Sequence, residues 1–168
     1  DIQTLIPHLV GAVGRLEPVN LGQNFIALVD YAHSPDAVAR VLAAAREMTS
    51  NRVIAVLGCG GDRDNSKRAL MGQELSLRSD IAIFTSDNPR SEDPEKILLQ
   101  MTQGLKISEP SAVVKDRAEA IELAVNLAQP GDVVIVLGKG HERGQDIAGV
   151  IHPFDDRLVL AHAIEAKK

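Results

Sequence analysis

Uninterrupted apolar runs alternate with amphipathic stretches along this chain. Runs at 25–31, 53–57, 80–85 and 132–137 show no polar alternation, which is typical of parallel strands that are buried on both faces. A shorter run at 112–115 predicts one more strand. The sequence therefore predicts a sheet whose central strands are all covered.

Helical periodicity fills the segments between these runs. Ser34 and Pro35 are a typical N-cap and first helical residue, and apolar positions then recur at helical spacing to Met48. The remaining pattern predicts helices at 70–78, at 94–104, after Asp116, and from Asp155 or Asp156 to Ala166, with a hairpin in 144–154. This alternation predicts the α/β class, with a Rossmann-like, doubly wound, mostly parallel sheet and helices on both faces.

Composition excludes several classes of protein. The 168 residues fit one domain, 45% of them are hydrophobic, and no apolar run approaches the ~20 residues that span a bilayer, so we expect no membrane partner and a cytoplasmic location. A net charge of -5 with few aromatic residues disfavours nucleic acid as a partner. Cys59 is alone and cannot form an internal disulfide. Because the chain begins at Asp1, it is compatible with a piece cut from a larger protein.

Polar residues follow four of the predicted strands. Segments 30–33, 60–68, 87–90 and 138–142 would converge, because parallel strands bring their carboxyl ends to one edge of the sheet. Within 87–90, Asn88 and Arg90 supply an amide and a guanidinium fork that suit a carboxylate. The segment taken alone is equally compatible with an ordinary strand-to-helix loop.

The other strand ends leave alternatives open. The glycines at 58–61 allow backbone amides to approach a ligand, but a plain tight turn explains them as well, and the segment matches neither a P-loop nor G-x-G-x-x-G. Histidines at strand ends, here His33 and His141, are more often packed or hydrogen-bonded residues than ligands or bases. Glu142 suits an ammonium group, with a solvated turn as the alternative. The carboxylates here are interspersed with Arg and Lys, so we expect no permanent metal site.

Five ordered motifs resemble the Mur ligase family. They occur in the family's order and spacing across nearly the whole chain. The motifs are Gly14-Arg15-Leu16-Glu17, residues 29–37, residues 58–64, Asp87-Asn88-Pro89-Arg90 and Gly138-Lys139-Gly140-His141-Glu142. The resemblance implies that 15–168 is the C-terminal amino-acid-binding domain of such a ligase. It also implies that 1–14 is the tail of the preceding central domain or a linker.

The resemblance also implies residue roles. Arg63, Asn88, Arg90, Gly138 and Glu142 would bind the incoming amino acid, and the form of the 87–90 motif is similar to that of members that add meso-diaminopimelate. Contacts to ATP would come from Arg15, Asp30, Tyr31 and His33. No residue of this chain would be a covalent catalyst, because positioning and electrostatics would carry the reaction.

The implied reaction needs more than this chain. Its acceptor substrate would be UDP-N-acetylmuramoyl-L-alanyl-D-glutamate, and its cofactor would be ATP with magnesium. The remaining partners would be the N-terminal and central domains of the same protein. The magnesium ligands would come mainly from the central domain. We therefore expect the isolated chain to be inactive. Ser86 and Ala69 depart from the family's usual Asp and Pro without removing a predicted contact. The alternatives are a ligase that adds L-lysine, a non-catalytic binding domain descended from a ligase, and a nucleotide-dependent oxidoreductase that lacks the usual fingerprint.

Overall fold

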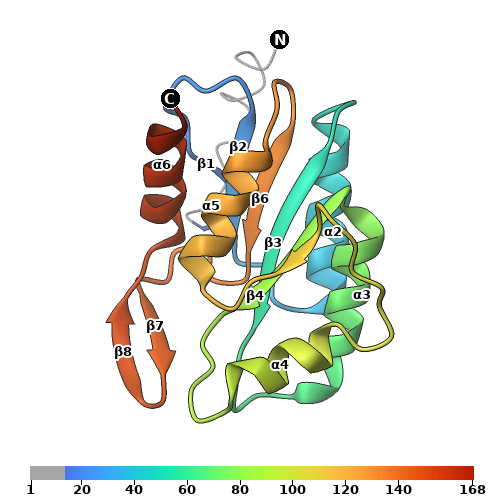
Figure 1. The fold of residues 1–168 in the computed structure, drawn as a ribbon, viewed down its shortest axis with the longest axis vertical. Coiled ribbons are helices and arrows are strands. Elements are labelled where there is room, and N and C mark those ends of the chain that lie inside the picture. Colours follow the sequence, from blue (N-terminus) through green and yellow to red (C-terminus); the bar gives the residue numbers. More distant parts are fainter. Residues whose placement is uncertain (1–13) are drawn as a thin grey trace.

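The computed structural model describes residues 14–168 and has a six-stranded sheet at its centre (Figure 1). The strand order is β1-β2-β6-β3-β4-β5; β1 pairs antiparallel with β2, and all other neighbours are parallel. The strands are β1 (Glu17–Pro18), β2 (Ile26–Asp30), β3 (Val53–Cys59), β4 (Ile81–Ser86), β5 (Ala112–Val113) and β6 (Val133–Leu137). The predicted mostly parallel sheet is confirmed.

Helices connect these strands and cover both faces of the sheet, as predicted (Figure 1). They are α2 (Pro35–Glu47), α3 (Arg68–Arg78), α4 (Pro94–Met101), α5 (Arg117–Leu127) and α6 (Asp156–Lys167), with a short 3-10 turn η2 (Asn65–Lys67) before α3. Side-chain caps begin four of the helices, from Ser34, Asp93, Asp116 and Asp155. The capping residues that begin helices were therefore visible in the sequence.

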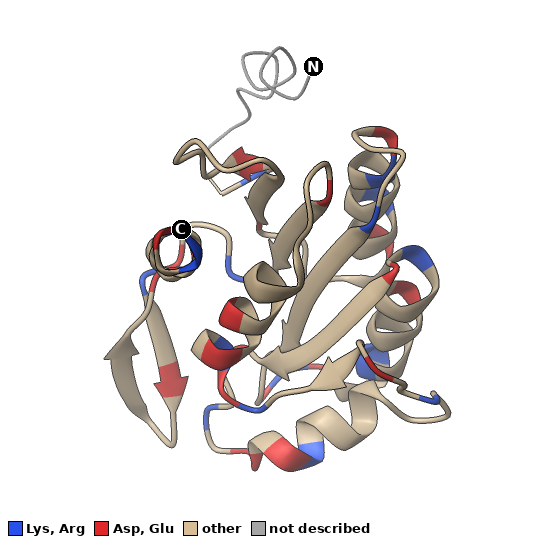
Figure 2. Ribbon diagram, turned by 45° about the horizontal axis from the view of Figure 1, so that its top comes forward, with Lys and Arg blue, Asp and Glu red and all other residues tan. Residues whose placement is uncertain are grey.

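Two hydrophobic cores lie on the two faces of the sheet. Alternate residues of β2 point to opposite sides. Leu28 belongs to the core that includes α2, α3 and α4, whereas Val29 belongs to the core that includes α5 and α6. Strands β3, β4 and β6 contain no charged residue, and Figure 2 shows most of the charged residues on the helices, the hairpin and the loops. The charged side chains available for a site therefore gather at the ends of the strands.

The structure differs from the predicted elements at their ends. β3 runs to Cys59, because Gly58 and Cys59 still pair with the end of β4, whereas the predicted strand 112–115 has only two residues in the sheet. The helix α4 ends at Met101 and not near Gly104. The strand β1 was not predicted, since two residues show no periodicity. Most of the expected 1–14 linker lies outside the described residues.

A hairpin extends from the body of the molecule below α6 in Figure 1. It consists of β7 (Gly144–Ile147) and β8 (Val150–Pro153), which pair antiparallel within the predicted range. A parallel bridge joins Ile147 to Arg90, so the hairpin contacts the loop that follows β4. No helix within residues 14–168 is long and apolar enough to cross a membrane.

Candidate functional site

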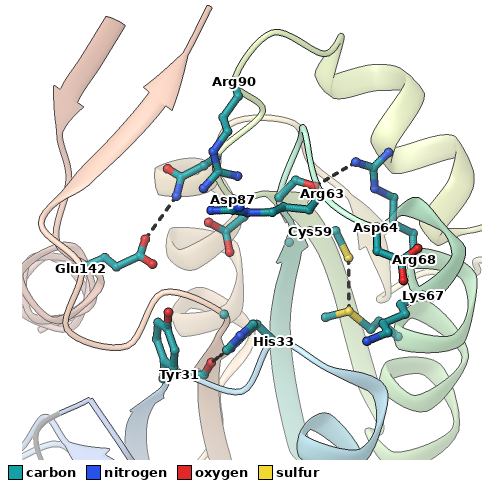
Figure 3. A pocket seen from close by; sticks show the side chains of 15 residues that line it. Tyr31, His33, Cys59, Arg63, Asp64, Lys67, Arg68, Asp87, Arg90 and Glu142 are labelled. Atoms are coloured by element: carbon teal, nitrogen blue, oxygen red, sulfur yellow. Dashed lines mark hydrogen bonds between the residues drawn. The ribbon is translucent and has the colours of Figure 1, made fainter. Parts of the chain in front are cut away.

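A pocket of about 390 Å³ lies at the carboxyl edge of the sheet (Figure 3). Its walls come from all four strand ends that the sequence singled out, which confirms that these segments converge. The lining residues are Tyr31, His33, Gly58, Cys59, Gly60, Arg63, Asp64, Lys67, Arg68, Met71, Asp87, Asn88, Arg90, Gly138 and Glu142. The five residues predicted to bind an amino acid are all among them.

The loop 87–90, which we call the clamp loop, is fixed by backbone hydrogen bonds to β7 and to the turn that follows it. The amide of Arg90 donates to the carbonyl of Asp146 at 2.9 Å, and the amide of Ala148 donates to the carbonyl of Arg90 at 2.8 Å. The side chain of Gln145 also donates to the carbonyl of Asp87 at 2.7 Å. These bonds hold the backbone of Arg90 at a φ of 53°, which is uncommon for residues other than glycine. The hairpin therefore sets the shape of the clamp loop.

The guanidinium of Arg90 has donors left for a ligand. Its Nη1 donates to the carbonyl of Gly61 at 2.8 Å, and within residues 14–168 its other N–H groups have no hydrogen-bond acceptor. A side chain at Gly60 would collide with it, because an added Cβ would lie 2.9 Å from Nη1 of Arg90. The loop 58–61, which we call the glycine loop, thus leaves room for the guanidinium of Arg90 in the pocket. A carboxylate placed there would receive charge-assisted hydrogen bonds.

Two carboxylates, Asp87 and Glu142, line the pocket beside the cations (Figure 3). Asn88 of the clamp loop contacts Glu142 and completes this acidic wall. Nδ2 of Asn88 donates to Oε2 of Glu142 at 3.2 Å, and Nζ of Lys139 lies 3.3 Å from Glu142 and 3.3 Å from Oδ1 of Asp87. Gly138 lets this wall close, because its φ of +113° is strained for any side chain and an added Cβ would lie 2.8 Å from Asp87. The pocket therefore presents both cationic groups and acidic oxygens to a ligand.

Arg68, the first residue of α3, supports the glycine loop by a hydrogen bond to the carbonyl of Gly60. It is buried, and its guanidinium donates to Glu92 at 2.6 and 3.1 Å, to Gln100 at 2.7 Å and to the carbonyl of Gly60 at 2.9 Å. Two hydrogen bonds hold the pKa of Glu92 below its ordinary value. The larger effect comes from the side chain of Arg68, and the smaller from the backbone amide of Asp62. By contrast, Arg63 and Lys67 are exposed at the pocket rim. Arg63 and Lys67, like Arg90, can therefore meet an anion in the pocket, whereas the guanidinium of Arg68 is engaged by Glu92, Gln100 and Gly60.

Aromatic rings form the remaining side of the site. Tyr31 and His33 line the pocket with ring centroids 4.5 Å apart, and His141 lies 5.9 Å from Tyr31. Asp30 is buried outside the lining, where its two oxygens accept from the amides of Ala32 at 2.7 Å and Leu16 at 2.8 Å. Arg15 is exposed and does not line the pocket. The pocket thus includes two of the four residues predicted to contact ATP.

Two further observations indicate which chemistry the pocket supports. Cys59 lines it, but burial and then the nearby Asp87 raise the pKa of its thiol to about 12, so it is a poor nucleophile. Within residues 14–168, no group of three or more His, Cys, Asp and Glu side chains has the arrangement of a metal site. The chemistry that the described pocket supports is recognition of charged groups.

Sequence reasoning missed the supports of the site. It named Lys139 only as a member of the motif 138–142, whereas the structure buries this side chain completely. It assigned no role to Gln145, which secures the clamp loop, or to Asp87, which lines the pocket within the recognised motif. The flanking glycines were the only local signal for Lys139, because its burial depends on Asp87 and Asn88 of the clamp loop, which lie about fifty residues earlier in the chain.

Comparison with known proteins gives one family. The family described as "Mur ligase, glutamate ligase domain" matches residues 14–140. Two curated relatives, from Streptomyces coelicolor and Syntrophomonas wolfei, are both named UDP-N-acetylmuramoyl-L-alanyl-D-glutamate–2,6-diaminopimelate ligase. They are 56% and 46% identical over 92% and 99% of this chain, which corresponds to 32% and 34% of their own lengths. The chain therefore spans about a third of these relatives.

Solved structures resemble the chain in the same way. A structure of a ligase with that same name superposes with a TM-score of 0.87 at 45% identity, covering 97% of this chain and 34% of the other. A bifunctional folylpolyglutamate synthase/dihydrofolate synthase, solved with Mn, AMPPNP and L-glutamate, superposes with a TM-score of 0.58 at 25% identity. That match covers 76% of this chain and 29% of the other. The arrangement of sheet and helices is thus shared with ATP-analogue-bound ligases.

Proposed function

The chain belongs to the Mur ligase family, and on that premise we propose that it is the C-terminal domain of an ATP-dependent, amide-forming ligase of peptidoglycan synthesis. The ligase adds meso-diaminopimelate to UDP-N-acetylmuramoyl-L-alanyl-D-glutamate, and this domain binds the incoming amino acid. The names of the relatives support this substrate. The protein acts in the cytoplasm, together with N-terminal and central domains of the same polypeptide.

One observation carries the assignment of the amino acid. The pocket sets the free donors of Arg90 on one side and the carboxylate of Glu142 on another, with the amide of Asn88 beside Glu142. The distal centre of diaminopimelate carries both a carboxylate and an ammonium group, whereas that of L-lysine has only the ammonium. Arg90, Asn88 and the rim residue Arg63 bind carboxylates, and Glu142 accepts the ammonium beside Gly138.

The aromatic side of the pocket fits a nucleotide. The rings of Tyr31 and His33 offer a surface for adenine, and Arg15 brings a positive charge for phosphate. Each oxygen of Asp30 accepts one backbone hydrogen bond and keeps a lone pair, which suits a ribose hydroxyl. ATP supplies the phosphoryl group that activates the acceptor carboxyl for attack by the amine. The central domain holds the magnesium.

A phosphate-release assay on the full-length protein tests this proposal. With ATP, magnesium and the UDP-linked dipeptide, meso-diaminopimelate gives ATP-dependent amide formation and L-lysine gives far less. The 168-residue chain alone gives none, because the groups that activate the acceptor lie on other domains. Equal turnover with L-lysine, no turnover with meso-diaminopimelate, or ligation by the isolated chain would each contradict a stated part of the proposal.

A further inference from the structure

Lys139 is a buried cation that does not line the pocket. Its side chain has 0% exposure, and Nζ donates to Oδ1 of Asn88 at 2.9 Å, to the carbonyl of Gly144 at 2.9 Å and to Oε2 of Glu142 at 3.3 Å. An ammonium has three N–H donors, and these contacts use all of them. Lys139 therefore has no donor for a ligand, and any effect on binding must act through the side chains that it holds.

Lys139 and the backbone amide of Asp146 together fix which way the amide of Asn88 faces. Oδ1 of Asn88 accepts from Nζ of Lys139 and from the amide of Asp146 at 2.9 Å. Both partners only donate, so the oxygen must face them and the NH₂ group must face the other way. That group donates to Glu142 at 3.2 Å, and within residues 14–168 it has no second acceptor. Asn88 thus presents a hydrogen-bond donor, and no acceptor, to the pocket.

Lys139 also sets the charge of this wall. Asp87 and Glu142 each lie 3.3 Å from Nζ, so one ammonium faces two carboxylates. The wall keeps one excess negative charge, which a single ligand ammonium balances. Without Lys139 the wall would have two uncompensated carboxylates, and these would repel a ligand carboxylate bound at Arg90 and Asn88.

We infer that Lys139 is a positioning residue that makes the pocket select amino acids with a carboxylate at their distal end. It does so by turning the Nδ2 donor of Asn88 toward the ligand and by neutralising one of the two neighbouring carboxylates. This inference rests on the proposed function, because it concerns how the same pocket distinguishes meso-diaminopimelate from L-lysine.

Steady-state kinetics of full-length Lys139→Met test the inference, since methionine keeps the length of the side chain and removes its charge. The KM for meso-diaminopimelate rises about tenfold or more, as expected for a lost charged hydrogen bond, while kcat changes less. The kcat/KM for L-lysine stays within about threefold of the parent value or rises. The ratio of the two kcat/KM values therefore falls, which a general loss of folded protein would not cause.

Two further variants keep the test decisive. Arg52→Met removes a cation that pairs with Asp132 at the opposite edge of the sheet, and it leaves the substrate ratio unchanged. Asn88→Asp keeps an oxygen for Lys139 and replaces the donor, so it lowers the ratio even if Lys139→Met does not fold.

Two results would overturn the inference: equal losses with both substrates in Lys139→Met, or an unchanged ratio in Asn88→Asp. The parent enzyme provides a separate check. If the parent failed to use meso-diaminopimelate, the proposed function itself would be wrong.

Discussion

The two edges of the parallel sheet use charged residues in different ways. At the amino edge, Asp132 accepts from the amide of Arg52 at 3.1 Å and from its guanidinium at 2.7 Å, and Asp80 accepts from the amide of Val53 and from Arg46, both at 2.7 Å. These carboxylates fasten the start of β3 to the residues before its two neighbouring strands. At the carboxyl edge, Arg90 keeps guanidinium donors without an acceptor in the described chain.

The difference separates structural charges from binding charges. Both edges belong to the same strands, and both have carboxylates near arginines. At the amino edge these groups satisfy one another and the backbone. At the carboxyl edge the buried Lys139 instead holds Asn88, whose Nδ2 donor faces the pocket. A charged cluster therefore indicates a ligand site only where its members have unused hydrogen-bonding groups.

The largest expected effect on stability comes from a buried pair beside the site. Arg117 and Asp156 are both 0% exposed and 2.7 Å apart, and Arg117 also donates to the carbonyls of Ser86 and Leu137. Asp156→Ala leaves the guanidinium buried without its counter-ion, so we expect a loss of about 3–5 kcal/mol in the free energy of unfolding. Urea denaturation of the 168-residue chain measures this loss.

The matched control removes both charges. The double variant Arg117→Met/Asp156→Met leaves no uncompensated ion, and we expect it to lose less free energy of unfolding than Asp156→Ala alone. A single variant that unfolds at the same urea concentration as the parent would show that this pair does not hold the ends of β4 and β6 together.

A smaller effect is expected at the amino edge. Burial would raise the pKa of Asp132, but hydrogen bonds from the side chain of Arg52 and from the amides of Gln129 and Arg52 outweigh it and hold this pKa below its ordinary value. Asp132→Asn should therefore cost about 1–3 kcal/mol at pH 7. Because the folded pKa is the lower one, the stabilisation is complete above about pH 4 and is lost as the pH falls through the folded pKa.

Urea denaturation of the parent and of Asp132→Asn from pH 7 to pH 2 checks this prediction. The stability difference between the two should shrink below about pH 4, whereas substrate binding at neutral pH should not respond to the variant. A difference that stays constant over the whole range would contradict the assigned pKa direction.

The smallest effect is expected at the thiol inside the pocket. With its pKa raised to about 12 by burial and Asp87, Cys59 stays a neutral thiol at pH 8. A maleimide reagent should label it slowly in the folded chain and rapidly in urea, as followed by mass spectrometry. Fast labelling of the folded chain would show that the pocket floor is more open than the structure indicates.

Local sequence was sufficient for most of the fold. Apolar runs located the central strands because a strand buried on both faces needs no polar positions, and the caps Ser34, Asp93, Asp116 and Asp155 are themselves sequence signals. The short strand β1 was missed because its partner, β2, defines it and periodicity does not. Strand ends were misplaced where pairing with a neighbour, as at Cys59, extends a strand beyond its apolar run.

The candidate site was predictable in part. Residues that follow strands, such as Arg90 and Glu142, could be placed at one edge because a parallel sheet aligns its carboxyl ends. The burial of Lys139 and its hold on Asn88 could not, because they depend on β6, the clamp loop and β7 meeting in three dimensions. The predicted contacts to ATP and to the amino acid all stay predictions, and two of the predicted ATP residues, Arg15 and Asp30, do not line the pocket.

Calorimetry of the full-length protein with meso-diaminopimelate and with L-lysine, for the parent and for Arg90→Ala, tests the central claim most directly. The parent should bind meso-diaminopimelate more tightly than L-lysine. Arg90→Ala should weaken binding of meso-diaminopimelate by at least about tenfold and leave L-lysine nearly unchanged, because only the former has a distal carboxylate. Equal affinity of the parent for both amino acids, or unchanged binding in Arg90→Ala, would contradict the account.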